Sequence, residues 1–313
     1  MMVLKRMVSV ILLFALILGS AGCAVDEGDK PRNGQVVDEV VYPLTVVDSE
    51  GREVRIEKEP ERVIAIGPNI TETIYALGEQ DKMVGRTDYC DYPEEVKQID
   101  SVGGLRAPNV EKIVALEPDL VMGSTHFKAE VVQKLEALNV KVLVLYEKEN
   151  FEGVYATIGK VGRVLNAKEK ADEVVSEMRQ KVREVRNKVT GRESPRVYYV
   201  VGFGEQNFTA GKDTFIGQLI ETAGGKNAAD DVEGWQYSLE RLVEKNPDML
   251  ICSKYYDAKE GIRNANGYKD LDAVKNNQLY EIDNNLLDRQ GPRLADGLTE
   301  LAKIIHPDAF NEQ

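Results

Sequence analysis

Residues 166–190 read NAKEKADEVVSEMRQKVREVRNKVT and predict one long helix. Asn166 is expected to cap its start, with Glu169 three residues later as in a capping box, and Gly191 follows its end. At ~1.5 Å per residue, about 22 helical residues span roughly 33 Å, so we expect the helix to lie across two bodies and join them. The alternative is a surface helix of a single domain. The apolar residues of the predicted helix recur at helical spacing and form one narrow stripe: Val174, Met178, Val182 and Val185.

The segments on the two sides of this helix resemble each other. Residues 110–124 read VEKIVALEPDLVMGS, and residues 239–253 read LERLVEKNPDMLICS. Each copy predicts a short helix, a Pro-Asp turn and a buried strand, which is typical of a parallel sheet. Two copies indicate two lobes rather than a solenoid, which would repeat every ~20–50 residues. The predicted fold class is therefore α/β, with two similar lobes of short, mainly parallel sheets bridged by one backbone helix.

The first 22 residues predict a targeting signal. Lys5 and Arg6 give a basic start, residues 8–18 form an apolar core too short for a comfortable membrane span, and small residues lead into Cys23. This pattern resembles a bacterial lipoprotein signal, in which Cys23 would be lipidated and become the new N-terminus. Ordinary secretion with cleavage nearby is the alternative. Both imply export, and lipidation implies anchoring to the outer face of the cell membrane.

The composition of the exported chain restricts its partners. Without residues 1–22 the chain keeps 38 basic and 53 acidic residues, a net charge of −15, which argues against nucleic acid or anionic membrane as a partner. Beyond Cys23 only Cys90 and Cys252 remain, so no disulfide framework is expected. The polar segment 23–41 reads as a flexible tether.

The rest of the chain divides into a first lobe at 42–165, the helix at 166–190 and a second lobe at 191–313. Asn69 with Glu72 is expected to begin a helix at about residue 70. Strands are predicted at 44–47, 53–56, 62–66, 83–85, 120–123 and 142–145, and in the second lobe at 196–201, 249–252 and 279–282. Further helices are predicted at 111–116, 130–138, 214–223 and 293–305.

Ligands of such sheets sit outside the carboxyl ends of the strands. The residues expected there are rich in aromatic side chains and include the single Trp, so two facing lobes would enclose a cleft for a flat or bulky ligand with polar edges. The candidate cleft residues are Asn69, Thr71, Tyr89, Asp91, Tyr92, Arg106, His126 and Phe127 in the first lobe, and Phe203, Phe208, Trp235, Gln236, Tyr255 and Arg289 in the second.

Several ordered segments resemble one family. The stretches RVIAIGPNITETIYALG, DYCDYPEEVKQI, NVEKIVALEPDLV, FTAGKDTFIGQLIETAGGKNAA and GPRLADGLTELAKIIHPD are similar to the extracytoplasmic binding proteins of ABC importers for cobalamin and iron chelates. The resemblance covers about residues 44–308. It implies a monomer that holds a ligand between two lobes, closes only modestly about one rigid helix, and delivers the ligand to a permease driven by its own ATPase.

The resemblance also bears on the ligand and on docking. The DYCDYP segment is similar to the cobalamin branch, and a neutral corrinoid suits a cleft with few paired charges. A ferric siderophore, often anionic, would need basic groups such as Arg106, Arg289 and Arg293; haem is a third candidate. Glu111 and Glu240 occupy equal places in the repeat and match the acid that family members present to arginines of the permease. The alternative is that both simply stabilise helix N-termini.

The sequence predicts neither a metal site nor a cofactor. His126 and His306 are the only histidines, and the branch of the family that binds naked zinc or manganese needs several. Met122 with His126 as haem ligands is less favoured than Met122 in a strand core, and Cys90 is expected to act as a small hydrophobe. No nucleophile–base set is present, so an enzyme is not expected. An exported α/β enzyme or a lipoprotein that serves a membrane sensor remain the alternatives from other classes.

Overall fold

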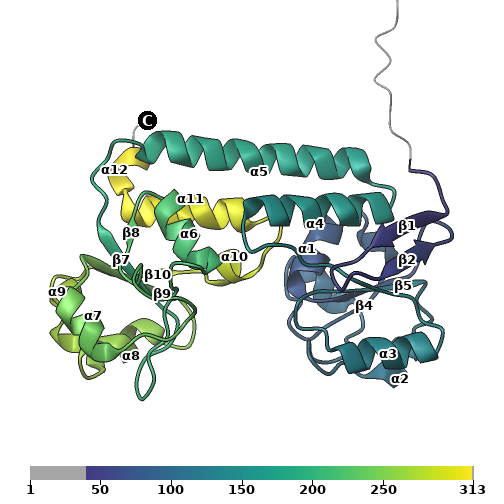
Figure 1. Ribbon diagram of the computed structural model, residues 1–313, viewed down its shortest axis with the longest axis horizontal. Helices are drawn as coiled ribbons and strands as arrows, with labels where there is room; N and C mark the ends of the chain where they lie inside the picture. Colours follow the sequence, from purple (N-terminus) through teal and green to yellow (C-terminus); the bar gives the residue numbers. More distant parts are fainter. Residues whose placement is uncertain (1–39, 312–313) are drawn as a thin grey trace, which may run out of the picture. The chain divides into compact units, whose positions relative to one another are not determined.

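The computed structural model describes residues 40–311 (Figure 1). The predicted targeting signal, Cys23 and nearly all of the tether lie outside the described residues. Within the described part, none of the helices combines the length and apolar character needed to cross a bilayer.

The first lobe is built on a four-stranded parallel sheet. Its strands lie in the order β4-β3-β5-β6, and the two central strands are buried along their whole length, as expected for strands covered on both faces. A short antiparallel hairpin, β1 (Leu44–Val47) with β2 (Glu53–Ile56), precedes this sheet. The sheet strands and helices are β3 (Val63–Ile66), α1 (Pro68–Ala76), β4 (Met83–Arg86), α2 (Val110–Ala115), β5 (Leu120–Gly123), α3 (Ala129–Ala137) and β6 (Val142–Val144), with short 3-10 turns at Gln80–Lys82 and Glu94–Gln98.

The second lobe repeats this plan. Its strands lie in the order β10-β9-β7-β8, all parallel, so each sheet reads second, first, third, fourth when its strands are numbered along the chain. The repeated segments become α2 with β5 and α7 with β9, the third strand of each sheet, which confirms the predicted fold class. The elements are β7 (Arg196–Val200), α6 (Phe215–Thr222), β8 (Lys226–Asn227), α7 (Leu239–Lys245), β9 (Met249–Ser253), α8 (Ala258–Asn264), a 3-10 turn at Tyr268–Asp270, α9 (Asp272–Lys275), β10 (Leu279–Ile282), α10 (Asn285–Asp288), α11 (Leu294–Ile305) and α12 (Pro307–Phe310).

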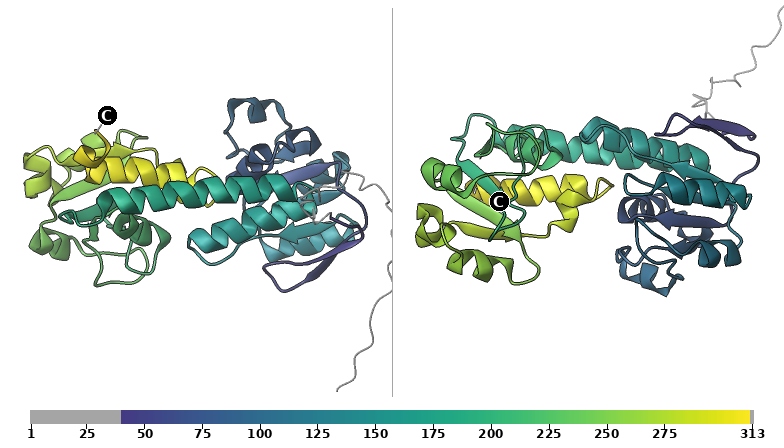
Figure 2. Two further views of the ribbon diagram at one scale, coloured as in Figure 1. Left: turned by 90° about the horizontal axis from the view of Figure 1, so that it is seen from above. Right: turned by 60° about the horizontal axis from the view of Figure 1, so that its bottom comes forward.

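The long helix α5 (Lys168–Val189) has 22 residues and follows directly on α4 (Phe151–Val164). It packs against α4, which precedes it, and against α11 at the far end of the chain (Figure 2). All four residues of the predicted stripe are buried. The chain from Val40 onward forms one compact unit, and the lobe boundaries at 165 and 191 stay predictions.

Helix α4 is absent from the sequence-based prediction. It carries three glycines and several β-branched residues, which lower helix propensity and conceal the apolar spacing of Val154, Ile158 and Val161. A tertiary contact explains one of the glycines. A Cβ on Gly162 would lie 2.5 Å from the Cβ of Ala171, so the glycine lets α4 and α5 approach closely.

Two predicted helix starts are wrong. Asn166 does not cap α5; it follows the last turn of α4 with a positive φ of 60°, and the N–H of Ala167 donates to the carbonyl of Gly162 at 2.7 Å, as in a Schellman motif. An asparagine tolerates this left-handed conformation, so it ends one helix instead of beginning the next. Asn69 does not cap α1 either, because the helix begins at Pro68 after Gly67.

Replacing Asn150 by Ala is expected to lower the free energy of unfolding by about 1 kcal/mol. The Asn150 side chain caps α4 by accepting a hydrogen bond from the N–H of Gly153 at 2.9 Å, and alanine leaves that donor without this partner. Urea unfolding followed by circular dichroism measures the change. Asn150→Asp, which keeps the acceptor, should unfold like the wild type; equal losses in both variants would contradict the capping role.

Candidate ligand-binding site

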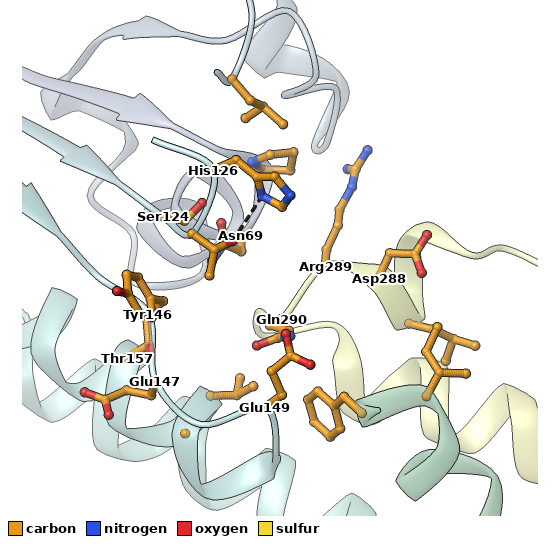
Figure 3. Close-up of a pocket in the computed structure, with 18 of the residues that line it drawn as sticks. Asn69, Ser124, His126, Tyr146, Glu147, Glu149, Thr157, Asp288, Arg289 and Gln290 are labelled. Atoms are coloured by element: carbon orange, nitrogen blue, oxygen red, sulfur yellow. Dashed lines mark hydrogen bonds between the residues drawn. The ribbon is translucent and has the colours of Figure 1, made fainter. Parts of the chain in front are cut away.

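A pocket of about 360 Å³ lies between the two lobes (Figure 3). Its volume falls within the ~300–1,000 Å³ of typical small-molecule sites. The first lobe contributes Leu105 and residues that follow the strands β3, β5 and β6. The second lobe contributes residues of α6 and α10 and the loops around Trp235 and Arg289, and α4 contributes three residues. The lining residues are Pro68, Asn69, Leu105, Ser124, Thr125, His126, Tyr146, Glu147, Glu149, Gly153, Val154, Thr157, Phe215, Ile216, Trp235, Leu287, Asp288, Arg289 and Gln290.

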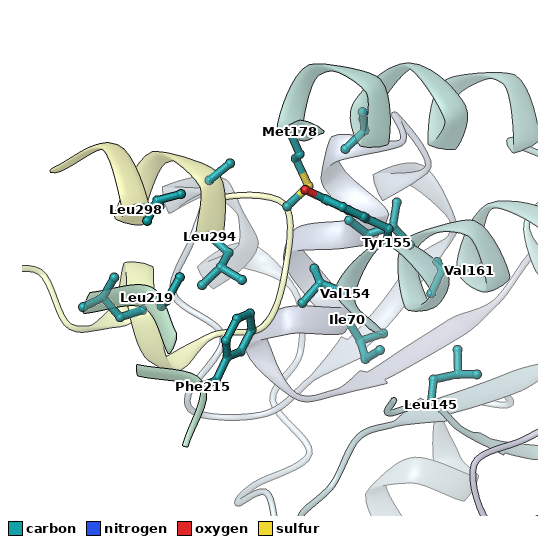
Figure 4. Packing of buried hydrophobic residues seen from close by; sticks show 14 of the residues in the cluster. Ile70, Leu145, Val154, Tyr155, Val161, Met178, Phe215, Leu219, Leu294 and Leu298 are labelled. Carbon is teal, nitrogen blue, oxygen red and sulfur yellow. The ribbon is translucent and has the colours of Figure 1, made fainter. Parts of the chain in front are cut away.

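The base of this pocket belongs to the main hydrophobic core. Val154 of α4 and Phe215 of α6 line the pocket and also pack in a cluster that includes Ile70 of the first lobe, Met178 of α5 and Leu294 of the second lobe (Figure 4). The two lobes therefore share one core along their helices. Close-packed interiors resist deformation, so we expect the base of the pocket to be rigid and any closure to be small.

The charged groups of the pocket are mainly acidic. Glu147 pairs with Lys160 of α4 at 2.6 Å. Glu149 is exposed, and no cation among residues 40–311 lies within ion-pair distance of it. Asp288 accepts a hydrogen bond from the Asn284 amide at 2.6 Å. Glu149 and Asp288 therefore form no ion pair within the described part of the chain, and the nearby Arg289 charge acts on Asp288 only through space.

An ionic cluster connects the lobes beside the pocket. Glu72 of α1, whose side chain is 2% exposed, accepts hydrogen bonds from Arg289 Nη1 at 2.8 Å, Arg293 Nε at 2.9 Å and Arg293 Nη2 at 2.7 Å. Arg289 Nη1 also contacts Asp91 Oδ1 at 2.7 Å, and the Arg293 guanidinium stacks 3.7 Å from the centre of the Tyr92 ring. We name these four charged residues, Glu72, Asp91, Arg289 and Arg293, the interlobe clasp.

The acids of the interlobe clasp stabilise the positive charge of both arginines. Burial opposes their positive charge, but hydrogen bonds to the acids outweigh it: Asp91 and Glu72 raise the pKa of Arg289, and Glu72 raises the pKa of Arg293. The Arg289 side chain extends from the second lobe away from Glu149 and Gln290 (Figure 3), towards its partners in the first lobe. Both guanidiniums are therefore paired before any ligand enters.

Four of the predicted cleft residues line the pocket: Asn69, His126, Trp235 and Arg289. His126 is exposed, and its Nδ1 pairs with the Thr125 hydroxyl at 3.0 Å. Asp91 and Tyr92 lie in the cluster around the two arginines, and the carbonyl of Tyr89 lies 3.5 Å from Arg289 Nη2.

The structure places two of the predicted first-lobe cleft residues in the core instead. Thr71 is fully buried, and its hydroxyl donates to the Cys90 sulfur at 3.0 Å, because the face of α1 that carries it packs inward. Phe127 turns back onto Gly123, so it too lies in the core. Arg106 is exposed but does not line the pocket, whereas its neighbour Leu105 does. Met122 and Cys90 are buried, as the sequence indicated.

Four predicted residues of the second lobe also lie outside the pocket. Phe203 packs edge-on against Tyr268, with ring centres 6.2 Å apart. Phe208 and Gln236 pair with each other in an isolated β-bridge, and Gln236 faces a different surface hollow. The Tyr255 hydroxyl donates to Asp283 at 3.1 Å. These four residues make contacts within the second lobe and do not line the pocket between the lobes.

Sequence reasoning missed the pocket residues that follow β6. Tyr146, Glu147 and Glu149 come directly after the strand predicted at 142–145, so the rule that placed the other residues at strand ends would have found them. Gly153, Val154 and Thr157 could not be found in this way, because the helix that carries them was not predicted. Phe215 and Ile216 lie in the predicted helix 214–223, and no site role was predicted for them.

The two repeated glutamates occupy equivalent surface positions. Glu111 lies in the first turn of α2, capped by Asn109, and Glu240 lies in the first turn of α7, capped by Ser238. Both glutamates are exposed, and no cation of residues 40–311 lies within ion-pair distance of either. Each is followed three residues later by an exposed valine, Val114 or Val243, on the same side of its helix. The repeat therefore presents one glutamate and one valine on each lobe.

Two similar lobes joined by a rigid helix, with a pocket between them, define the class of solute-binding proteins. The family model for periplasmic binding proteins matches residues 63–286, and the chain belongs to this family. Its members bind a substrate outside the cytoplasm, so the chain is a binding protein and not an enzyme.

The chain is similar to proteins of known sequence and structure. It is 34% identical over 309 residues to an uncharacterised ABC transporter substrate-binding lipoprotein, YvrC, of Bacillus subtilis, covering 96% of this chain and 97% of that one. It is 28% identical to a cobalamin-binding protein of Halobacterium salinarum, covering 85% and 74%. A solved structure described as a possible iron-binding, periplasmic solute-binding protein of Staphylococcus epidermidis is 30% identical, with a TM-score of 0.71 over 82% of this chain and 100% of that one.

Proposed function

We propose that this protein captures a metal chelate of the corrinoid type, such as cobalamin, and delivers it to the permease of an ABC importer. One observation carries the choice of ligand. The arginine that lines the pocket is already paired with two carboxylates, while Glu149 and Asp288 form no ion pair among the described residues. A pocket of this charge favours a ligand that is neutral overall and has hydrogen-bond donors on its rim.

The peripheral amides of a corrinoid match these features. Amide N–H groups can donate to Glu149, Asp288 and the side-chain oxygen of Asn69, and the flat macrocycle can pack on aromatic side chains such as Trp235 and Tyr146. An anionic ferric siderophore or the propionates of haem would need free basic groups. Arg106 does not line the pocket, and Arg289 and Arg293 are held in the clasp. These two chelates are the alternative ligands.

Titration of the purified protein with cyanocobalamin, haemin and a ferric catecholate siderophore tests the proposal. Trp235 is the single Trp of the chain and lines the pocket, so its fluorescence reports on ligand entry. We expect saturable quenching by cyanocobalamin at the lowest concentrations. Tighter binding of either anionic chelate would reject the corrinoid and select that chelate instead.

Trp235→Ala is expected to weaken corrinoid binding by roughly five- to fifty-fold. Trp235 is 42% exposed, so its accessible surface is available to stack on a ligand. Because the variant has no Trp, isothermal titration calorimetry measures its affinity. Tyr256→Ala is the matched control, since this aromatic side chain is 99% exposed and does not line the pocket. Equal affinities of Trp235→Ala and the wild type would remove Trp235 from the binding site.

We further propose that Glu111 and Glu240 dock the loaded protein on the permease. Their equivalent positions on two similar lobes suit a partner with two similar subunits, and the exposed Val114 and Val243 add a small apolar contact beside each charge. Lipid on Cys23, which lies outside the described residues, would hold the protein at the membrane surface near its permease. A monomer is sufficient for this arrangement.

A further inference from the structure

We propose that Asp91 is a specificity-determining residue, which excludes anionic chelates from the pocket by neutralising the interlobe clasp. The proposal rests on the proposed function, because it concerns the ligand of the same pocket. In this proposal Asp91 does not contact the ligand itself. It acts through Arg289, the clasp residue that also lines the pocket.

The charges of the clasp balance. Glu72 and Asp91 are negative, Arg289 and Arg293 are positive, and the four together carry no net charge. Glu72 alone cannot neutralise two guanidiniums, although it contacts both. The second negative charge comes from Asp91, whose carboxylate lies 2.7 Å from Arg289 Nη1. Removing the charge of Asp91 leaves one positive charge beside the pocket.

The position of Asp91 makes this role separable from folding. Its side chain is 46% exposed, whereas that of Glu72 is almost completely buried. Substitution of Asp91 therefore leaves the buried part of the clasp, between Glu72 and both arginines, in place. The resulting excess charge is partly shielded from water, because the Arg289 side chain is only 12% exposed, and a shielded charge acts strongly on a nearby ligand.

A pair of ligands that differ in one charge tests the proposal. Cyanocobalamin and its monocarboxylic acids have nearly the same shape, but one peripheral amide is a carboxylate in the acids. We expect the wild type to bind the amide form more tightly. In Asp91→Asn the ratio of the two dissociation constants should shift towards the acids by roughly tenfold. Asp91→Glu, which keeps the charge, should restore the wild-type ratio.

Glu95→Gln is the matched control. Glu95 is exposed, lies four residues further along the chain, and does not line the pocket, so this substitution makes the same charge change away from the clasp. The control should keep the wild-type ratio. An unchanged ratio in Asp91→Asn, or an equal shift in Glu95→Gln, would overturn the proposal and leave the corrinoid function intact.

Failure of the proposed function would be recognised separately. If the wild type binds neither corrinoid, haemin and its dimethyl ester replace them as the charged and uncharged pair, and the same shift in their ratio is expected. Citrate is an anion that tests the charge of the pocket without any metal chelate. Its binding should raise the thermal unfolding midpoint of Asp91→Asn more than that of the wild type or Glu95→Gln. The absence of both effects would overturn the role of Asp91.

Discussion

Glu72→Gln is expected to lower the free energy of unfolding by about 3 kcal/mol. Glu72 is the one acid that contacts both clasp arginines, and these arginines are themselves mostly buried, with side chains 12% and 18% exposed. A glutamine keeps the shape but removes the charge, so two guanidiniums in a poorly solvated place lose their compensation. Removing one partner of a buried ion pair lowers the free energy of unfolding more than replacing both partners by well-packed apolar residues.

Urea unfolding of the purified variants measures this effect. Glu95→Gln, an exposed site with the same change in charge, should stay within about 0.5 kcal/mol of the wild type. The double variant Glu72→Gln with Arg293→Met should lose less than the sum of the two single losses, because the second change removes one of the uncompensated charges. Equal stability of Glu72→Gln and Glu95→Gln would show that the clasp does not stabilise the fold.

Replacing both Glu111 and Glu240 by Ala is expected to reduce chelate uptake roughly tenfold while ligand affinity stays that of the wild type. Exposed ion pairs contribute ~0.2–1 kcal/mol each, and two independent contacts add, so the loss falls between about twofold and thirtyfold. The glutamates lie on α2 and α7, away from the pocket lining, which separates docking from capture.

The control for docking must address the alternative that these acids only stabilise helix N-termini. Glu130 and Glu260 are exposed first-turn glutamates of α3 and α8, one in each lobe, and their double alanine variant makes the same change at other helices. Uptake of labelled cobalamin by cells that express each variant in place of the wild type compares them. Normal uptake by cells with the double variant of Glu111 and Glu240 would contradict the docking proposal. Normal uptake by cells that lack the protein altogether would favour the alternative that it serves a membrane sensor.

The strands and the repeat could be predicted because both depend on local sequence patterns. β5 and β9 are continuous apolar runs bounded by Pro-Asp and Ser, and the spacing of Val174, Met178, Val182 and Val185 gives α5 its buried side without reference to the rest of the chain. Helix α4 was not predicted because its three glycines lower helix propensity, and only Gly162 is explained by a contact with α5. Without α4 in the prediction, Asn166 was assigned to the start of α5 instead of the end of α4.

The candidate site was predicted only in part. The rule that ligands meet strand ends found Asn69 and His126, but it could not tell which side chain at a strand end turns inward, as Thr71 and Phe127 do. The same rule placed Trp235, Arg289 and Phe203 at this edge of the second lobe. Trp235 and Arg289 line the pocket, whereas Phe203 packs against Tyr268 of its own lobe.

The amino-acid sequence by itself determined that this protein has two similar α/β lobes and one long helix, because hydrophobic periodicity and turn residues act over a few neighbours. Only the tertiary structure decided the charge of the pocket. Glu72 and its arginine partners are 217 and 221 residues apart, and no local pattern relates them. The arginines that the sequence offered to an anionic ligand are neutralised by contacts that exist only after the two lobes have packed together.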